Sequence, residues 1–239
     1  MAILEARDIH KSFFFKGELS KVLHGINLKL EENEFISIVG ASGCGKSTLL
    51  ELLSGISLPD SGDIICEGQL VTGKTGILGY MPQDDLLFPW LKTMDNILLP
   101  VRVQGKNIHI EKEKAAKLLP VFGLESYADH LPWQLSGGLR QRAALARTYM
   151  IGSKVLLLDE PLANLDAITR SGLQDWLGEV VHNLSLAIIL VTHDIDEAIK
   201  LSDRIEVMKN GLFVASIKVE NRADERYCKV MKEQIQMAL

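Results

Sequence analysis

The chain has 239 residues, of which 47% are hydrophobic and 24% are charged, with a formal net charge of −5. This length allows one large α/β domain, or a core domain with a modest insert. No apolar run approaches the roughly 18 residues of a membrane-spanning helix, and Glu5 and Asp8 argue against a secretory signal. The negative charge disfavours a nucleic-acid-binding protein, and three scattered cysteines are typical of reduced thiols in a cytosol.

The first elements expected are strands at residues 3–9 and 21–30, separated by a loop at 16–20. Phe13, Phe14 and Phe15 lie at the loop or strand end between them. One of these rings is a candidate for stacking on a purine base. We expect the other two to pack in the core.

A phosphate-binding loop is predicted at residues 40–48, with the sequence GASGCGKST. It follows an apolar, β-branched run at 35–39 and precedes a helical pattern at 48–53, which is the strand–loop–helix context of such loops. Its glycines allow positive φ angles and let backbone N–H groups converge on an anion. Lys46 is predicted to reach the β- and γ-phosphates, and the Ser47 hydroxyl to ligate Mg²⁺. The predicted nucleotide-binding residues of this loop are Gly40, Ser42, Gly43, Cys44, Gly45, Lys46, Ser47 and Thr48.

Strands are also predicted at 64–66 and 77–81, the second ending at Pro82–Gln83. An aromatic, proline-broken loop follows at 84–91, and then helical patterns at 94–99 and 111–122. These features predict a helical insert of roughly 60 residues. Within it, Trp90 is either a core residue or part of an exposed groove.

A second anion-receptive helix start is predicted at Ser136, Gly137 and Gly138, with the helix running to Tyr149. A flexible helix cap without a ligand is the alternative. A single nucleotide does not need two such helix starts from one subunit, so a site shared between two subunits would explain both.

Polar residues follow three apolar strands at the edge where ligands bind in open α/β sheets. Asp159 and Glu160 follow the strand at 155–158, His193 follows the strand at 188–192, and Gln83 follows the strand at 77–81. Asp159 is suited to hold hydrated Mg²⁺, and Glu160 to poise a water for in-line attack on the γ-phosphate. His193 is predicted to contact the γ-phosphate or that water, and Gln83 to sense the metal or the water.

The continuous apolar strands at 155–158 and 187–191 predict a parallel sheet covered on both faces. The region 204–218 reads as a hairpin turning at Asn210–Gly211, and an amphipathic helix is expected at about 224–237.

Together these motifs resemble the ATP-binding cassette (ABC) ATPases along nearly the whole chain. The matching segments are the Walker A loop at 40–48, the Q-loop at Gln83, the signature at 135–141, Walker B at 156–160, the D-loop at 163–166 and the switch histidine at His193. Phe13 is similar in position to the aromatic residue that stacks on adenine in this family. The signature departs from the family pattern at Leu139, where Gln or Met is commoner.

The resemblance implies one α/β domain over residues 1–239. Its P-loop NTPase core, over 1–83 and 151–239, would have a mostly parallel sheet and an N-terminal antiparallel β region. An inserted α-helical subdomain, over about 84–150, would carry the signature. It also implies binding of ATP and Mg²⁺ in a head-to-tail homodimer with two sandwiched nucleotides. Ser136, Gly137, Gly138 and Asp166 would contribute to that shared site.

The stretch after Gln83 is similar to that of importers of nitrate, taurine, aliphatic sulfonates and pyrimidine thiamine precursors. The resemblance implies a peripheral ATPase at the cytoplasmic face of the cell membrane. Its Leu86–Asn96 region would contact a separate transmembrane permease, and an extracytoplasmic solute-binding protein would be an indirect partner. A soluble ATPase of iron–sulfur assembly and an ATPase of a lipoprotein or efflux exporter remain alternatives. A cassette that hydrolyses ATP poorly is disfavoured by the presence of Glu160 and His193.

Overall fold

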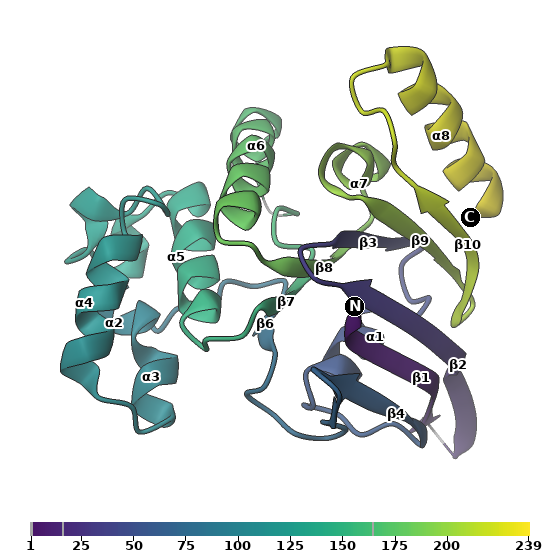
Figure 1. The fold of residues 1–239 in the computed structure, drawn as a ribbon, viewed down its shortest axis with the longest axis horizontal. Helices are drawn as coiled ribbons and strands as arrows, with labels where there is room; N and C mark the ends of the chain where they lie inside the picture. Colours follow the sequence, from purple (N-terminus) through teal and green to yellow (C-terminus); the bar gives the residue numbers. More distant parts are fainter. Residues whose placement is uncertain (1, 16, 164) are drawn as a thin grey trace.

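The computed structural model describes residues 2–15, 17–163 and 165–239, and its strands form two sheets (Figure 1). The strands are β1 (Ala2–Phe15), β2 (Glu18–Glu31), β3 (Phe35–Gly40), β4 (Ser61–Cys66), β5 (Gln69–Leu70), β6 (Gly79–Met81), β7 (Val155–Asp159), β8 (Ala187–Thr192), β9 (Arg204–Lys209) and β10 (Leu212–Lys218). The helices are α1 (Lys46–Leu53), α2 (Thr93–Ile97), α3 (Leu99–Val103), α4 (Ile108–Leu118), α5 (Gly137–Tyr149), α6 (Ala167–Asn183), α7 (Ile195–Leu201) and α8 (Glu225–Ala238), with 3₁₀ turns η1 (Glu125–Tyr127) and η2 (Pro132–Gln134).

The larger sheet confirms the predicted parallel arrangement. Its strand order is β10-β9-β3-β8-β7-β6, and all neighbouring pairs from β9 to β6 are parallel. Strands β3, β7 and β8 are buried along their whole length, as expected for strands covered on both faces. The predicted hairpin is also confirmed: β10 pairs antiparallel with β9, and Asn210 and Gly211 both adopt positive φ in the turn.

The smaller sheet is antiparallel, with the order β2-β1-β4-β5. One hydrophobic cluster joins it to helix α1 and to one face of the parallel sheet. Leu49, Leu50 and Leu52 of α1 are completely buried in this cluster. Burial therefore holds α1, and with it the phosphate loop, against both sheets.

Helices cover the rest of the parallel sheet. A second hydrophobic cluster packs α3, α4, α5 and α6 with residues of β7 and β8, and a third packs α7 and α8 against β9. In Figure 1, α2, α3 and α4 lie beyond α5, away from the antiparallel sheet, while α8 lies near the C-terminus beside α7. The polypeptide between β6 and β7 therefore forms a helical layer at one end of the sheet.

Two expectations for the N-terminal hairpin are wrong. Residues 18–20 belong to β2, so the predicted loop at 16–20 is shorter, with Gly17 at φ +85° in the turn. Only one of the three phenylalanines was expected to lie outside the core, but both Phe13 and Phe14 do: they are 41% and 80% exposed, because they lie at the tip of the strand pair, beyond the hydrophobic cluster. The side chain of Phe15 lies outside the described part of the chain.

The segment before the helical layer also differs from expectation. Strand β6 begins at Gly79, and Ile77 is exposed instead of belonging to it. Trp90 is 70% exposed, so it is not a core residue. Among the described residues, none of the helices combines the length and the apolar character needed to cross a membrane.

Candidate functional site

The phosphate loop lies between the end of β3 and the start of α1, and its chain reverses through two glycines at positive φ. Gly43 has φ +79° and Gly45 has φ +109°, a region in which side chains with a Cβ are strained. At Gly45 a Cβ would also lie 2.8 Å from Leu23 Cδ2, so only glycine fits. The segment 41–43 is exposed while Cys44 is buried beneath it. The loop therefore presents its backbone to solvent as an open cradle.

The cradle has the charge that a phosphate group needs. Helix α1 starts at Lys46, and its N-cap Gly45 has no side chain to bond the first N–H groups, which leaves them directed at the loop. Lys46 is only 6% exposed, and its Nζ donates to the carbonyl oxygens of Gly40 at 2.8 Å and Ala41 at 3.0 Å. A cavity of about 380 Å³ borders residues 41–44, the start of β2 and the β9–β10 turn. This donor set fits a nucleotide phosphate chain.

A hydroxyl and a carboxylate meet beside the loop. Ser47, in the first turn of α1, donates from Oγ to Asp159 Oδ1 at 3.2 Å. Asp159 ends β7 and is 5% exposed. The pKa of Asp159 is raised, because the effect of burial exceeds the opposing effects of the Ser47 hydrogen bond and the charge of Lys46. The two oxygens are of the type that Mg²⁺ prefers.

A second pair of side chains in contact involves Glu160, the residue that follows Asp159. Glu160 has φ +44°, a left-handed conformation that is unusual outside glycine, and its N–H donates to Val191 O at 2.9 Å. Its Oε2 lies 2.9 Å from Nδ1 of His193, the residue that follows β8. An ionised carboxylate can only accept, so Nδ1 carries the hydrogen and Nε2 is left for another partner. Thus Asp159 contacts Ser47, whereas Glu160 contacts His193.

Gln83 lies at the same edge of the sheet. Met81 pairs with Leu158 in parallel register, so Gln83 and Glu160 each lie two residues past a paired position on neighbouring strands. Gln83 is exposed. The strand ends therefore bring Gln83, Asp159, Glu160 and His193 to one edge, next to the phosphate loop.

The predicted signature residues lie at the start of α5. Ser136 is the exposed N-cap of that helix, and its Oγ accepts from Leu139 N at 3.3 Å. A Cβ on Gly137 would lie 3.0 Å from Leu165 Cδ2, and one on Gly138 would lie 3.1 Å from Thr169 Cγ2. The glycines thus allow close packing with Leu165, before α6, and with the first two turns of α6 itself. Figure 1 shows α5 in the helical layer, apart from α1.

Asp166 ends the predicted D-loop and caps α6, since its Oδ1 accepts from Thr169 N at 3.0 Å. This hydrogen bond lowers the pKa of Asp166. Asn164, in the same motif, lies outside the described residues. Arg170, a residue that the sequence analysis did not single out, donates from Nη2 to Ala163 O and Leu165 O of this motif.

Phe13 lies near the phosphate loop through the pairing of β1 with β2. It pairs with Ser20, which borders the cavity next to residues 41–44. Lys11 Nζ lies 5.1 Å from the centroid of the Phe13 ring. With 41% exposure, this ring has surface available for a base.

Tyr80 is a further residue that the sequence analysis missed. It is half-buried on β6, and burial together with the nearby Asp159 carboxylate raises its pKa. The signal in the sequence was its position in the strand that leads to Gln83. Tyr80 contributes a neutral hydroxyl next to Asp159.

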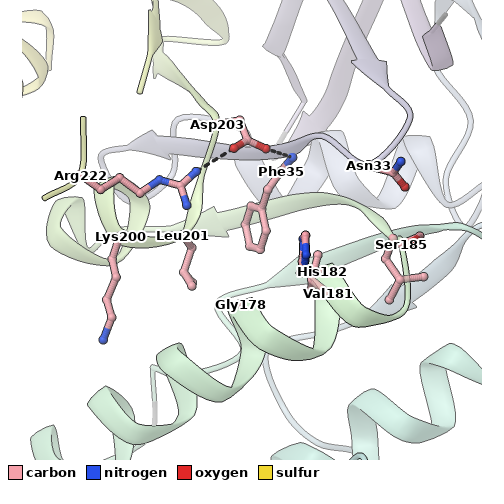
Figure 2. A pocket seen from close by; sticks show the side chains of 11 residues that line it. Asn33, Phe35, Gly178, Val181, His182, Ser185, Lys200, Leu201, Asp203 and Arg222 are labelled. Carbon is pink, nitrogen blue, oxygen red and sulfur yellow. Dashed lines mark hydrogen bonds and ion pairs between the residues drawn. The ribbon is translucent and has the colours of Figure 1, made fainter. Parts of the chain in front are cut away.

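Another pocket, of about 390 Å³, lies at the opposite edge of the parallel sheet (Figure 2). It is bordered by Phe35 at the start of β3, by Ser185 before β8 and by Asp203 before β9. In Figure 2, Asp203 bonds both the Phe35 N–H and the Arg222 guanidinium. None of the predicted site residues borders this pocket, so the candidate site is the carboxyl edge.

A phosphate loop on a mostly parallel sheet, with two carboxylates and a histidine at the neighbouring strand ends, defines a P-loop nucleotide-binding protein. The family model described as "ABC transporter" matches residues 23–163. The chain is 42% identical over 191 residues to the formylaminopyrimidine import ATP-binding protein ThiZ of Halalkalibacterium halodurans, covering 80% of this chain and 74% of that protein. It is 39% identical over 208 residues to the taurine import ATP-binding protein TauB of Pseudomonas aeruginosa, covering 87% of this chain and 79% of that protein.

Among solved structures, the ATP-binding cassette MJ0796, in a dimeric post-hydrolysis state bound to ADP and Pi, matches with a TM-score of 0.77 and 27% identity, covering 91% of this chain and 99% of that one. The chain therefore belongs to the ABC transporter family, as an ATP-hydrolysing transport ATPase of the importer group. The resemblance found in the sequence is confirmed.

Proposed function

We propose that this ATPase energises the import of a small solute through a separate transmembrane permease. The observation that carries the proposal is the arrangement at the carboxyl edge of the sheet. There the Ser47–Asp159 pair adjoins the phosphate loop, and the Glu160–His193 pair lies one residue further along the chain. This arrangement separates a metal-holding pair from a water-activating pair.

The phosphate loop holds ATP through the residues from Gly40 to Thr48. The N–H groups of the exposed segment 41–43 and of the first turn of α1 donate to the phosphate oxygens, and Lys46 exchanges its contacts with the loop carbonyls for contacts with phosphate. Ser47, Asp159 and Gln83 would hold Mg²⁺, which when bound would neutralise charge on the phosphates. The oxygen donors Ser47 Oγ and Asp159 Oδ1 support this assignment.

Glu160 serves as general base toward the attacking water, and His193 keeps its carboxylate in position. The left-handed backbone at Glu160 turns this side chain away from Asp159 and toward His193. With Nδ1 donating to Glu160, Nε2 of His193 is free to contact the γ-phosphate or the water. A carboxylate held by one hydrogen bond retains oxygen lone pairs for the proton.

Phe13 is the residue proposed to stack on adenine, and its neighbour Phe14 provides a matched control. Phe13→Ala is expected to raise the KM for ATP about five- to thirty-fold, since stacking on a base contributes about 1–2 kcal/mol. Phe14→Ala is expected to change KM less than about two-fold, because Phe14 is 80% exposed at the strand tip. Steady-state hydrolysis measurements over a range of ATP concentrations compare the two. Equal effects of both substitutions would remove Phe13 from this role.

The functional unit is a head-to-tail homodimer, in which Ser136, Gly137 and Gly138 of one chain meet the nucleotide of the other. Support comes from the exposed Ser136 at the N-terminus of the 13-residue helix α5, a second anion-receptive helix start in the same chain. The solved relative is dimeric. Asp166, exposed at the start of α6, lies on the neighbouring segment and contributes to the same interface.

The permease contact is an exposed apolar patch made by Leu86, Phe88 and Trp90. These side chains are 60%, 37% and 70% exposed, and the rings of Phe88 and Trp90 lie 5.2 Å apart between centroids. The buried Asn96 fixes their backbone, accepting from Phe88 N at 2.8 Å and donating to Leu91 O at 3.0 Å. An ordered loop with exposed apolar side chains is suited to bind a partner.

Helix α5 connects this patch with the signature. Arg147 donates to the carbonyl oxygens of Leu86 at 2.6 Å and Asp85 at 2.5 Å, and Arg140 Nε lies 3.0 Å from Asp85 Oδ2. Ser136 is the N-cap of α5. A displacement of the loop at residues 85–90 by the permease would therefore displace α5 and the signature residues at its start. In this proposal the ATPase lies at the cytoplasmic face of the cell membrane, with an extracytoplasmic solute-binding protein as an indirect partner.

The solute is a small molecule of the nitrate, sulfonate or taurine kind, or a thiamine precursor. This inference rests on the names of the relatives, which include import ATP-binding proteins for formylaminopyrimidine, taurine and aliphatic sulfonates.

A photo-crosslinking amino acid at position 90 tests the permease contact in membranes of the source organism. We expect a crosslink to a multispanning permease, identified by mass spectrometry, which is lost when Leu86 and Phe88 are changed to Ser. The same probe at position 237, which is 84% exposed on α8, is the control. A crosslink only to a soluble iron–sulfur assembly protein, or to an exporter, would replace the proposal with one of those functions.

A further inference from the structure

A polar cluster centred on Arg170 links two segments that flank the Glu160–His193 pair. Arg170 lies in the first turn of α6, and its Nη2 donates to Leu165 O at 2.9 Å and Ala163 O at 3.4 Å. Its Nη1 lies 3.8 Å from Asp194 Oδ2. One guanidinium therefore contacts both the backbone that follows Glu160 and the residue that follows His193.

Asp194 sets the position of His193 relative to helix α7. Its Oδ1 accepts from the N–H groups of Asp196 at 2.9 Å and Glu197 at 3.1 Å, which makes it the N-cap of α7. Its own N–H donates to Thr192 Oγ1 at 3.0 Å. A carboxylate that caps α7 through Oδ1 and faces the Arg170 guanidinium through Oδ2 restrains the backbone on the C-terminal side of His193.

Two buried polar atoms of this cluster have no hydrogen-bond partner within the described residues. They are Arg170 Nε and Glu197 Oε1. Glu197 is 4% exposed, and burial raises its pKa while the charge of Arg170 lowers it. Arg170 and Glu197 border a small cavity together with Glu160 and His193. A buried polar atom without a hydrogen-bond partner costs free energy and is rare in native proteins, and a functional role is one reason for retaining it.

The segment that Arg170 holds also contacts the signature. Leu165 packs close to Gly137, where a Cβ would lie only 3.0 Å from Leu165 Cδ2. The contacts therefore run from the start of α5, through Leu165 and Arg170, to Asp194 and His193. No residue in this series belongs to the phosphate loop.

We propose that Arg170 is a positioning residue for hydrolysis, which acts through His193 by holding the His193–Asp194 backbone against Ala163 and Leu165. It places Nδ1 of His193 opposite Glu160 and couples this placement to the packing of the signature. The inference rests on the roles assigned above to Glu160 and His193, and it goes beyond them by adding a residue that touches neither nucleotide nor metal.

Steady-state hydrolysis by Arg170→Met and Arg170→Lys tests the proposal. Arg170→Met is expected to lower kcat about ten-fold with the KM for ATP changed less than about two-fold, because the phosphate-loop contacts are untouched. Arg170→Lys keeps the charge but not the forked geometry, and is expected to recover part of kcat. Arg222→Met is the matched control: Arg222 also bonds a backbone carbonyl and an aspartate, at Ser202 O and Asp203, and lies at the opposite sheet edge.

A double-mutant cycle with His193→Ala separates positioning from general stabilisation. If Arg170 acts through His193, the Arg170→Met change should lower kcat less than about two-fold in the His193→Ala background. A further ten-fold loss there, or wild-type kcat in Arg170→Met alone, would overturn the proposal. Thermal melting checks folding, and if Arg170→Met is unfolded, the same cycle with Arg170→Lys gives the answer. Near wild-type kcat in His193→Ala itself would instead contradict the role given to His193 under the proposed function.

Discussion

Glu160→Gln is expected to slow ATP hydrolysis by about 10²- to 10⁴-fold, the range for removal of a group that handles a proton. This corresponds to about 3–5 kcal/mol of activation free energy. ATP affinity should be unchanged, because the contacts of the phosphate loop, Lys46 and the Ser47–Asp159 pair remain. Single-turnover hydrolysis and equilibrium nucleotide binding measure the two effects separately.

The same variant tests the homodimer. If hydrolysis separates the subunits, blocking it should let ATP accumulate a dimer that size-exclusion chromatography with light scattering detects. Glu179→Gln, an exposed carboxylate on α6, is the control and should hydrolyse ATP at the wild-type rate. Hydrolysis by Glu160→Gln within a factor of about two of wild type, about 0.4 kcal/mol, would exclude Glu160 as the general base.

Lys46→Ala is expected to weaken ATP binding itself by about 10- to 100-fold. A charged hydrogen bond to phosphate contributes about 1.5–3 kcal/mol, and a tenfold change in affinity corresponds to about 1.4 kcal/mol. Lys46 is buried at 6% exposure and already bonds two loop carbonyls, so the substitution also removes contacts from the free protein. Isothermal titration with ATP measures affinity, and thermal melting without nucleotide measures the effect on folding.

Lys229→Ala is the control for the loss of one positive charge, since Lys229 is exposed on the C-terminal helix α8. It should bind ATP with wild-type affinity. Unchanged affinity in a folded Lys46→Ala protein would contradict the assignment of residues 40–48 as the phosphate site. Glu160→Gln and Lys46→Ala are therefore expected to differ in kind: the first lowers the rate of turnover, and the second lowers the affinity for ATP.

Several features of this protein followed from its sequence, because they depend on local stereochemistry. Gly43 and Gly45 are required where the backbone adopts positive φ, so the loop was recognisable from its glycines and the flanking patterns. Buried parallel strands are continuous apolar runs, and ligand residues follow their carboxyl ends. Asp159, Glu160 and His193 could thus be placed at one edge before any contact was known.

Contacts between distant segments were decided only by the tertiary structure. The bond between Glu160 and His193 depends on the left-handed backbone at Glu160 and on the pairing of β7 with β8. The exposure of Phe13 and Phe14 depends on how far the β1–β2 pair extends beyond the core, which composition does not reveal. Arg170 gave no signal in the sequence, since its partners Ala163, Leu165 and Asp194 come together only when α6 packs beside α7. Local patterns determined which groups the site contains, and long-range packing determined which of them touch.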